Sequence, residues 1–310
     1  MAVTPALVLQ ILLTVMTPVF IVIAVGFMIR RFTSIDAHSL SDIILYAFTP
    51  CLVFTLITQS SLGSGAWVGI AFITIATALV MMGVSWSIGK ALGLGRKSMS
   101  AIILSTSLVN TGNYGLPVSL LAFGEKGLEL AVVYFVVSSV LSYTLGVLIA
   151  SHGTQGLKES LRSVTRLPHI YAVLAAFAVK LLGVGVPQPA LQAVNLMGQA
   201  AIPAMLVVLG MELAQSALLR SGSVNWALVG LSSALRLFFP IIPVVLLSSL
   251  IGLGGLARNA TLVQACMPTA VLSVIFTVKF KGDSQFVTSV IILSTLASAV
   301  TLTLLLSFIA

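Results

Sequence analysis

Residues 110–117 read Asn-Thr-Gly-Asn-Tyr-Gly-Leu-Pro and interrupt a largely apolar segment, residues 98–122. Inside a helix, Gly costs about 1 kcal/mol and Pro about 3 kcal/mol relative to Ala. In hydrocarbon each backbone group freed by a break needs a new partner, so irregular backbone is tolerated where it is buried or lines a watery cavity. The stretch therefore predicts a membrane helix that is broken near its middle.

A second break is predicted at residues 264–270, Gln-Ala-Cys-Met-Pro-Thr-Ala, within the apolar segment 258–278. Pro is preorganised for the first position of a helix, so we expect Pro117 and Pro268 each to start a second half-helix. Broken helices at equivalent positions of two repeats indicate a transporter binding site. The alternative is a pair of kinks that only assist packing, because Gly and Pro are common in transmembrane helices.

The composition places the whole chain in a membrane. Of 310 residues, 59% are hydrophobic and only 22 are charged, 15 basic and 7 acidic, whereas a quarter of a soluble domain is charged. A span needs roughly 20 apolar residues, which leaves room for about ten spans. Runs such as 68–82 and 291–309 lack the alternating pattern of a β-barrel. The sequence predicts an all-α integral membrane protein in the lipid bilayer.

Charge, Gly and Pro punctuation divides the chain into ten predicted spans. They cover residues 6–29, 39–59, 65–89, 98–122, 128–150, 168–183, 190–216, 224–251, 258–278 and 285–308.

The net charge of +8 indicates orientation in the membrane rather than a nucleic acid partner. Most basic residues flank the connections that follow odd-numbered spans: Arg30, Arg31, Lys90, Arg96, Lys97, Lys158, Arg162, Arg166, Arg220, Lys279 and Lys281. These connections should face the cytoplasm, which places both termini on the non-cytoplasmic side of the cell inner (plasma) membrane.

Similar stretches in the two halves indicate a duplication. Residues 138–142 (Ser-Ser-Val-Leu-Ser) resemble residues 294–298 (Ser-Thr-Leu-Ala-Ser), and Trp67 and Trp226 open corresponding spans. We expect a first five-helix repeat over residues 1–150, a cytoplasmic connector over 151–167 and a second repeat over 168–310. Because five is odd, the second repeat must be inverted in the membrane.

This geometry suits a small anion at the point where spans four and nine cross. The two second half-helices should direct their N-termini, each equivalent to about half a positive charge, at one central point. Asn110, Asn113 and Thr269 could add hydrogen bonds without the cost of a buried charge. The candidate substrate-binding residues are Asn110, Thr111, Asn113, Gly115, Pro117, Gln264, Met267, Pro268 and Thr269.

Glu212 and Arg236 are the most unusual charges within predicted spans. An unpaired Arg in mid-span costs roughly 2.5–3.5 kcal/mol on insertion scales, so Arg236 needs a partner or water. Glu212 is the expected partner, and Asp42 the second choice. The pair could sense protons or substrate, or it could be a structural ion pair with snorkelling side chains.

The sequence gives no sign of an enzyme or a cofactor. His38, His152 and His169 fall in or beside polar connections, which predicts solvated surface rather than metal ligands. Cys51 and Cys266 are far apart in apolar segments, which gives no support to a disulfide or a zinc site. A GxGxxA pattern at residues 252–257 lies between membrane helices without the βαβ context that a dinucleotide site needs.

The motifs resemble the auxin efflux carrier family. Asn110-Thr111 followed by Gly115-Leu116-Pro117, and Val263-Gln264-Ala265 followed by Pro268, are similar to its two crossover motifs. Thr17-Pro18 with Gly26, residues 209–213 and the closing Ser294-Thr295 also fit, and the fuller Asn-Thr-Gly-Asn form resembles the bacterial branch, with its malate- and malonate-type permeases.

The resemblance implies ten helices in two inverted repeats, with broken helices four and nine crossing. It also implies a mobile transport domain and a scaffold domain, each drawn from both repeats, and elevator-type movement of organic anions such as malate, malonate or auxin-like acids. The middle connection is about seventeen residues long, whereas many plant carriers have a long cytoplasmic loop. That departure argues against a plant auxin exporter.

Two alternatives remain open from the sequence. A bile-acid-type sodium symporter would have a similar crossing, but neither predicted break contains an acid. A membrane sensor or scaffold would bind a ligand without moving it. Coupling to protons, sodium or membrane potential is open, and faces rich in Gly, Ala and Ser are compatible with a homodimer as well as a monomer.

Overall fold

The computed structural model describes residues 4–60, 62–151, 157–218 and 224–309, and every regular element within these ranges is a helix. Seven stretches are long and apolar enough to cross a membrane, and Pro168–Leu182 is a shorter apolar helix. Many large apolar side chains are exposed, such as Leu181, Leu250 and Phe32. The chain is therefore a multi-pass, all-helical membrane protein, as the sequence predicts.

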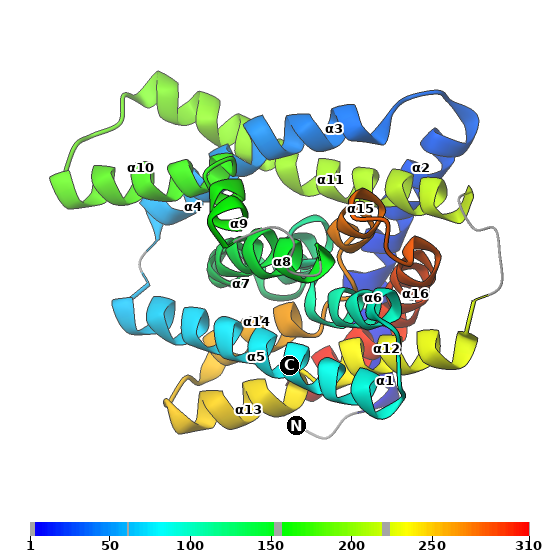
Figure 1. Cartoon of the computed structure of the whole chain (residues 1–310). Coiled ribbons are helices and arrows are strands. Elements are labelled where there is room, and N and C mark those ends of the chain that lie inside the picture. Colours follow the sequence, from blue (N-terminus) through cyan, green and yellow to red (C-terminus); the bar gives the residue numbers. More distant parts are fainter. Residues whose placement is uncertain (1–3, 61, 152–156, 219–223, 310) are drawn as a thin grey trace.

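The helices follow one another along the chain with short connections (Figure 1). In the first half they are α1 Pro5–Ile11, α2 Thr17–Phe32, α3 Ala37–Ile43, α4 Thr49–Gln59, α5 Ser64–Ala91, α6 Arg96–Ser107, α7 Leu116–Leu141 and α8 Val147–Ala150. In the second half they are α9 Leu157–Val164, α10 Pro168–Leu182, α11 Gln188–Leu218, α12 Trp226–Phe238, α13 Ile241–Leu250, α14 Gly255–Ala265, α15 Leu272–Lys279 and α16 Ser284–Ile309.

Four π-helical turns continue these helices, and three of them precede a Pro. They are η1 Leu12–Met16, η2 Ile44–Phe48, η3 Thr111–Gly115 and η4 Ser142–Gly146. Pro18, Pro50 and Pro117 each occupy the second position of the α-helix that follows η1, η2 or η3. Because Pro has no N–H and its ring clashes with the preceding turn, a wider turn before it lets the chain continue in a helical path.

The helices form two groups (Figure 1). The first helix group consists of α2, α3, α4, α10 and α11. In Figure 1, α3, α4, α10 and α11 lie in the upper part of the view, and α2 runs down from its upper right into the middle of the molecule. The second helix group consists of α5–α8 and α12–α16. Gly26 and Gly210 let α2 and α11 touch, because a Cβ at either residue would collide with a backbone carbonyl of the other helix.

Both predicted breaks are present, and they pair with each other. Between α6 and η3, and between α14 and α15, the chain is not helical, and Val109 and Thr269 form an antiparallel bridge. The Asn110 N–H donates to the Pro268 carbonyl at 2.9 Å, and the Ala270 N–H donates to the Leu108 carbonyl at 2.9 Å. The backbone groups freed by one break are thus satisfied by the other, as hydrocarbon requires.

The sequence predicted that Pro117 and Pro268 each start a second half-helix. Pro117 does stand at the second position of α7, but a π-helical turn precedes α7, and Pro268 starts no helix. One second half-helix begins at Thr111 with η3 and runs into α7, and the other is α15, which begins at Leu272. Pro268 instead lies in the extended segment, where its carbonyl accepts the bond from Asn110. Gly124 then bends α7 with a φ of 67°, a left-handed conformation that Gly adopts without strain. This bend falls between the fourth and fifth predicted spans.

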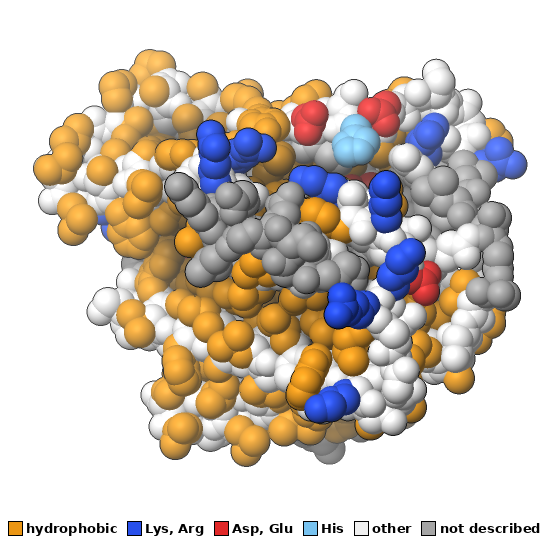
Figure 2. Space-filling model, in the orientation of Figure 1, with side chains coloured by type: hydrophobic (Ala, Val, Ile, Leu, Met, Phe, Trp, Pro, Cys, Tyr) orange, Lys and Arg blue, Asp and Glu red, His pale blue; other side chains and the backbone are white. Residues whose placement is uncertain are grey.

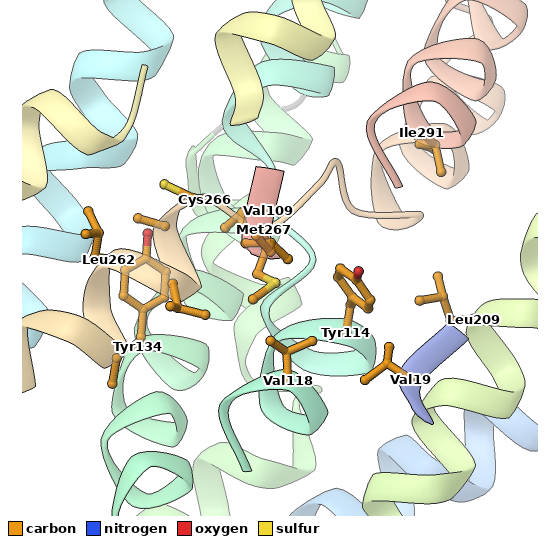
Figure 3. Close-up of a cluster of buried hydrophobic side chains, with 14 of the residues drawn as sticks. Val19, Val109, Tyr114, Val118, Tyr134, Leu209, Leu262, Cys266, Met267 and Ile291 are labelled. Carbon is orange, nitrogen blue, oxygen red and sulfur yellow. The ribbon is translucent and has the colours of Figure 1, made fainter. Parts of the chain in front are cut away.

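The crossing lies inside the largest apolar core. Figure 3 shows Met267 beside Val109, with Tyr114 and Val118 next to them and Tyr134 on the far side. Tyr114 is fully buried, and its hydroxyl bonds the Ser298 hydroxyl of α16 at 2.9 Å. The crossing is therefore held by apolar packing as well as by hydrogen bonds.

Candidate functional site

The N-terminal ends of the two second half-helices line one cavity of about 210 Å³. From the first break come residues 109–113, with Asn110 at the N-cap of η3. From the second break come Ala270, Val271 and Leu272. The first N–H groups of a helix have no carbonyl one turn back, and they carry a partial positive charge. Residues from both helix starts thus line one cavity, although the N–H groups of Thr111, Ser273 and Val274 already donate to the carbonyls of Val109, Ala270 and Val271.

A second cavity, of about 380 Å³, adjoins the first. The two share Ser41, Glu212, Val271 and Ile275 in their walls. The wider cavity is also lined by His38, Gln215 and Lys279, of which His38 and Lys279 are exposed. Figure 2 shows Lys and Arg side chains spread over the face that contains α9, α15 and α6 in Figure 1, whereas apolar side chains surround them.

Glu212 is the only acidic residue that lines these two cavities in the described part of the chain. It belongs to α11, in the first helix group, and its carboxyl group lies beside the Asn113 amide and the Ser41 hydroxyl. Its Oε2 atom is buried and has no hydrogen-bond partner among the described residues. A carboxyl group from one helix group therefore meets the N-terminal turn of η3 in the other.

Hydroxyl groups and one histidine also line the smaller cavity. Thr111 Oγ1 and Ser138 Oγ are 2.8 Å apart, and Ser139 Oγ lies 2.8 Å from His169 Nε2. The prediction of a solvated His169 is wrong, because its side chain is 1% exposed and packs against the ring of Phe135. Its position at the start of α10 suggested surface, but α7 covers it. His38 is exposed as predicted, and His152 lies outside the described residues.

Arg236 has partners other than the predicted carboxylates. Its guanidinium donates to the Thr106 carbonyl at 2.7 Å and to the Ala265 carbonyl, in the last turns of α6 and α14. Glu212 lies instead at the cavity, and Asp42 is exposed on α3 and lines neither cavity. Arg236, which was expected to pair with Glu212, therefore binds the C-terminal ends of α6 and α14.

Of the nine predicted binding residues, Asn110, Thr111 and Asn113 line the smaller cavity, and the other six are buried around it. Gln264 donates to the Ser119 hydroxyl at 3.2 Å and packs against Gly115. Thr269 donates its hydroxyl to the Ser105 carbonyl at 2.6 Å. Pro117, Met267 and Pro268 are buried in the protein interior. These six residues shape the crossing rather than contact the cavity.

The sequence prediction missed most of the cavity wall. The additional polar lining residues are Ser41, Thr49, Ser138, Ser139, Ser142, Tyr143 and His169. The serine-rich stretch at residues 138–142 was a detectable signal, although it was used only to identify the repeat. The described residues contain no group of three or more His, Cys, Asp or Glu side chains that could hold a metal ion, and both cysteines are free thiols.

Comparison with known proteins agrees with a membrane transporter. The sequence model of the family described as "Membrane transport protein" matches residues 11–163 and 156–306. An uncharacterized transporter of Methanocaldococcus jannaschii is 24% identical over 296 residues, which cover 92% of this chain and 95% of the relative. An uncharacterized transporter of Methanothermobacter thermautotrophicus is 28% identical over 275 residues, which cover 87% of this chain and 88% of the relative.

Proposed function

Because this chain belongs to the auxin efflux carrier family of membrane transport proteins, we propose that it is a secondary transporter of small organic anions. The substrate would be a carboxylate such as malate, malonate or an auxin-like acid. The observation that carries this proposal is the convergence of the Thr111 and Leu272 helix ends on one cavity. Helix N-termini bind anions through free N–H groups and a favourable dipole.

The side chains at these helix ends suit a carboxylate. Asn110 and Asn113 offer amide donors in the smaller cavity, and Thr111 and Ser138 offer hydroxyl groups. Neutral donors bind an anion without the desolvation cost of a permanently buried cation. The site would thus hold the substrate with dipoles and hydrogen bonds rather than with an arginine clamp.

We propose that transport is an elevator-type movement of the second helix group against the first. The smaller cavity lies between the groups: Ser41, His169 and Glu212 come from the first group and the breaks from the second. The pairing of Thr111 with Ser138 is matched by that of the Thr269 N–H with the Ser294 hydroxyl, at 3.3 Å, which supports two repeats. The proposed topology is ten spans in two inverted five-helix repeats.

Under the proposed topology both cavities open toward the cytoplasm. The wider one ends at His38 and Lys279, which flank connections with an excess of basic residues. Both termini would then face away from the cytoplasm, in the plasma membrane. The structure would represent an inward-facing state of the transport cycle.

We assign the coupling role to Glu212. An organic anion and an ionised carboxylate would repel each other in the same cavity, and like-charge contacts cost several kcal/mol. A proton or a sodium ion bound at Glu212 would remove that repulsion while substrate is bound. Glu212 thus supplies an acidic side chain at the crossing, although residues 110–117 and 264–270, the two predicted breaks, contain no Asp or Glu.

Uptake into liposomes tests the proposal. Purified protein should accumulate labelled malate, malonate or indole-acetate with saturation, under a proton gradient, a sodium gradient or a membrane potential applied in separate experiments. Asn113→Ala should lower uptake by about tenfold, the effect of losing roughly 1.4 kcal/mol of binding. The matched control is Asn259→Ala, because Asn259 bonds the Ile309 carbonyl in α16 and lines neither cavity.

Two results would contradict the assignment. If no organic anion moves under any gradient while the protein stays folded, the substrate class is wrong and a sensor becomes the better hypothesis. If Asn113→Ala transports at the full rate at equal protein amounts, the anion binds elsewhere.

A further inference from the structure

We propose that Arg236 is a positioning residue. It holds the first halves of the two broken helices together and thereby orients their second halves toward the cavity. This inference rests on the proposed transport function for its consequence, but its geometry stands independently. Arg236 lies on α12 and is 2% exposed. It contacts neither of the two cavities that would hold the substrate.

The guanidinium joins two helices that are far apart in the sequence. It donates through one terminal nitrogen to the Thr106 carbonyl of α6 at 2.7 Å and through the other to the Ala265 carbonyl of α14. Both acceptors lie in the last turn of the first half of a broken helix, where backbone carbonyls have no partner within the helix. One side chain therefore caps both helices.

The neighbouring carbonyls of α6 are also bonded across the crossing. The Ser105 carbonyl accepts from Thr269, and the Leu104 carbonyl accepts from the Ser273 hydroxyl at 3.2 Å. Three successive carbonyls at the end of α6 thus bind the second break, α15 and Arg236. This end of the crossing is held by direct protein contacts, and only a small cavity of about 20 Å³, lined by Arg236, Ser107 and Val109, remains beside it.

The charges on this side balance without an acid. Each helix C-terminus is equivalent to about half a negative charge, so two of them together oppose the single positive charge of Arg236. This explains how a buried Arg can lie in a membrane protein away from Glu212, its expected partner. The dipoles that Arg236 neutralises belong to α6 and α14, and no described cation in the walls of the smaller cavity neutralises the N-terminal dipoles of η3 and α15.

The planar fork of Arg suits this task better than the ammonium of Lys. Arg presents several N–H donors in fixed directions, whereas Lys is a point charge on a flexible stem. Lys at this position would cap one helix end well and the other poorly. We therefore expect Arg236→Lys to rescue only part of the function.

The two native cysteines provide a test that does not depend on any substrate. Cys266 follows Ala265 directly at the second break and is 2% exposed, whereas Cys51 lies on α4 in the first helix group. We would measure labelling by N-ethylmaleimide of Cys266 in a Cys51→Ser background and of Cys51 in a Cys266→Ser background. Arg236→Gln should raise the labelling rate of Cys266 about tenfold and leave that of Cys51 unchanged. The loss of a cation from a partly buried helix C-terminus destabilises that end enough to raise the population of its open form about tenfold.

Lys180→Met is the matched control. Lys180 on α10 also donates to two backbone carbonyls at a helix end, those of Ile57 and Ser60, but in the first helix group. It should leave Cys266 labelling unchanged. Anion uptake should fall at least tenfold in Arg236→Gln, with a raised KM, and should lie between this value and wild type in Arg236→Lys.

The proposal is overturned if Cys266 labelling is the same in wild type and Arg236→Gln, or if both cysteines become equally reactive, which indicates general loosening. If Arg236→Gln does not yield folded protein, Arg236→Lys decides by the same two labelling rates. Failure of wild-type protein to move any anion would contradict the proposed function and would leave the labelling result intact.

Discussion

The two sides of the crossing differ in how their helix ends are satisfied. On one side, the C-terminal ends of α6 and α14 are bonded to Arg236 and to Thr269 and Ser273 of the other break. On the other side, the helix starts at Thr111 and Leu272 face a cavity of about 210 Å³. The end at Arg236 is thus nearly closed, with a cavity of only about 20 Å³ beside it, whereas the end at Thr111 and Leu272 opens into the larger cavity.

The difference shows how a membrane protein can create a positive potential at a binding site without a Lys or Arg side chain that binds the ligand. Breaking a helix creates two opposite partial charges, and Arg236 cancels the negative ones. The positive ones remain at the cavity, together with Asn110 and Asn113.

Placing a negative charge at the open side should be the most damaging change. Asn110→Asp keeps the size and shape of a residue at the N-cap of η3, where Asp is also well tolerated. The new carboxylate would repel the substrate, and we expect anion affinity to fall about 100-fold, equivalent to roughly 2.7 kcal/mol. Equilibrium binding of labelled substrate would measure this.

Asn225→Asp is the control for added charge. Asn225 is the exposed N-cap of α12, its side-chain oxygen accepts from the Leu228 N–H as an Asp would, and it lines neither cavity. Equal affinity in wild type and Asn110→Asp would mean that the open helix ends do not bind the anion.

Gly115→Ala should disturb the contact between the two breaks. A Cβ at Gly115 would collide with the amide of Gln264, which is buried and bonded to Ser119. Overpacking of this kind costs typically 1–3 kcal/mol, so thermal unfolding should occur at lower temperature and uptake should fall about tenfold. Gly83→Ala on exposed α5 surface, with open space around it, should change neither value. An unchanged melting temperature for Gly115→Ala would show that the contact is not tight.

Glu212→Gln should separate coupling from binding. The amide keeps the side-chain volume beside Asn113 and Ser41 but cannot ionise. Uptake should lose its dependence on the driving cation gradient. Substrate affinity should stay within about threefold of that of wild type with its coupling cation bound, because the uncharged amide no longer repels the anion and the binding dipoles are unchanged. Counterflow and gradient-driven uptake, measured on the same liposomes, distinguish the two. Gradient-driven accumulation at the wild-type level would remove Glu212 from the mechanism.

Ser139→Ala should have the smallest effect. It removes the bond of 2.8 Å to His169, which joins α7 of the second helix group to α10 of the first. A hydrogen bond contributes about 1 kcal/mol, so the balance between conformations should shift about fivefold toward states without this contact. Ser87→Ala, whose serine bonds only its own helix, is the control. A change in uptake rate larger than the Asn113→Ala loss would contradict this ranking.

The sequence was most informative about the backbone. Pro, Gly and Asn within apolar segments located both breaks, because these residues have a known cost inside a helix. Composition was sufficient to predict membrane helices, and hydropathy located the approximate bounds of several of them, such as Ser64–Ala91 and Ser284–Ile309. It did not do so for the predicted spans 98–122 and 128–150, because Thr111–Ala150 is one continuous apolar stretch. These inferences depend on local chemistry, which a single sequence contains.

The side-chain environment was much less predictable. Arg236 bonds two backbone carbonyls, and a backbone carbonyl leaves no trace in the sequence. His169 was expected at the surface because it follows a polar connection, but α7 covers it in three dimensions. Gln264, Met267 and Thr269 were placed at the site because they stand beside Pro268, yet they face the protein interior. Proximity in the chain did not indicate which side of the crossing a residue faces.

An organic anion that occupies the cavity at the open helix ends should shield a cysteine placed in the cavity wall from chemical labelling. Val271→Cys, in a Cys51→Ser background, places a thiol where both cavities meet, while Cys266 is buried. Ser34→Cys, in the exposed connection before α3, serves as control. We predict that the transported acid slows N-ethylmaleimide labelling of Val271→Cys in a saturable manner and leaves Ser34→Cys unaffected. Equal labelling of Val271→Cys with and without a saturating, transported acid would contradict the account.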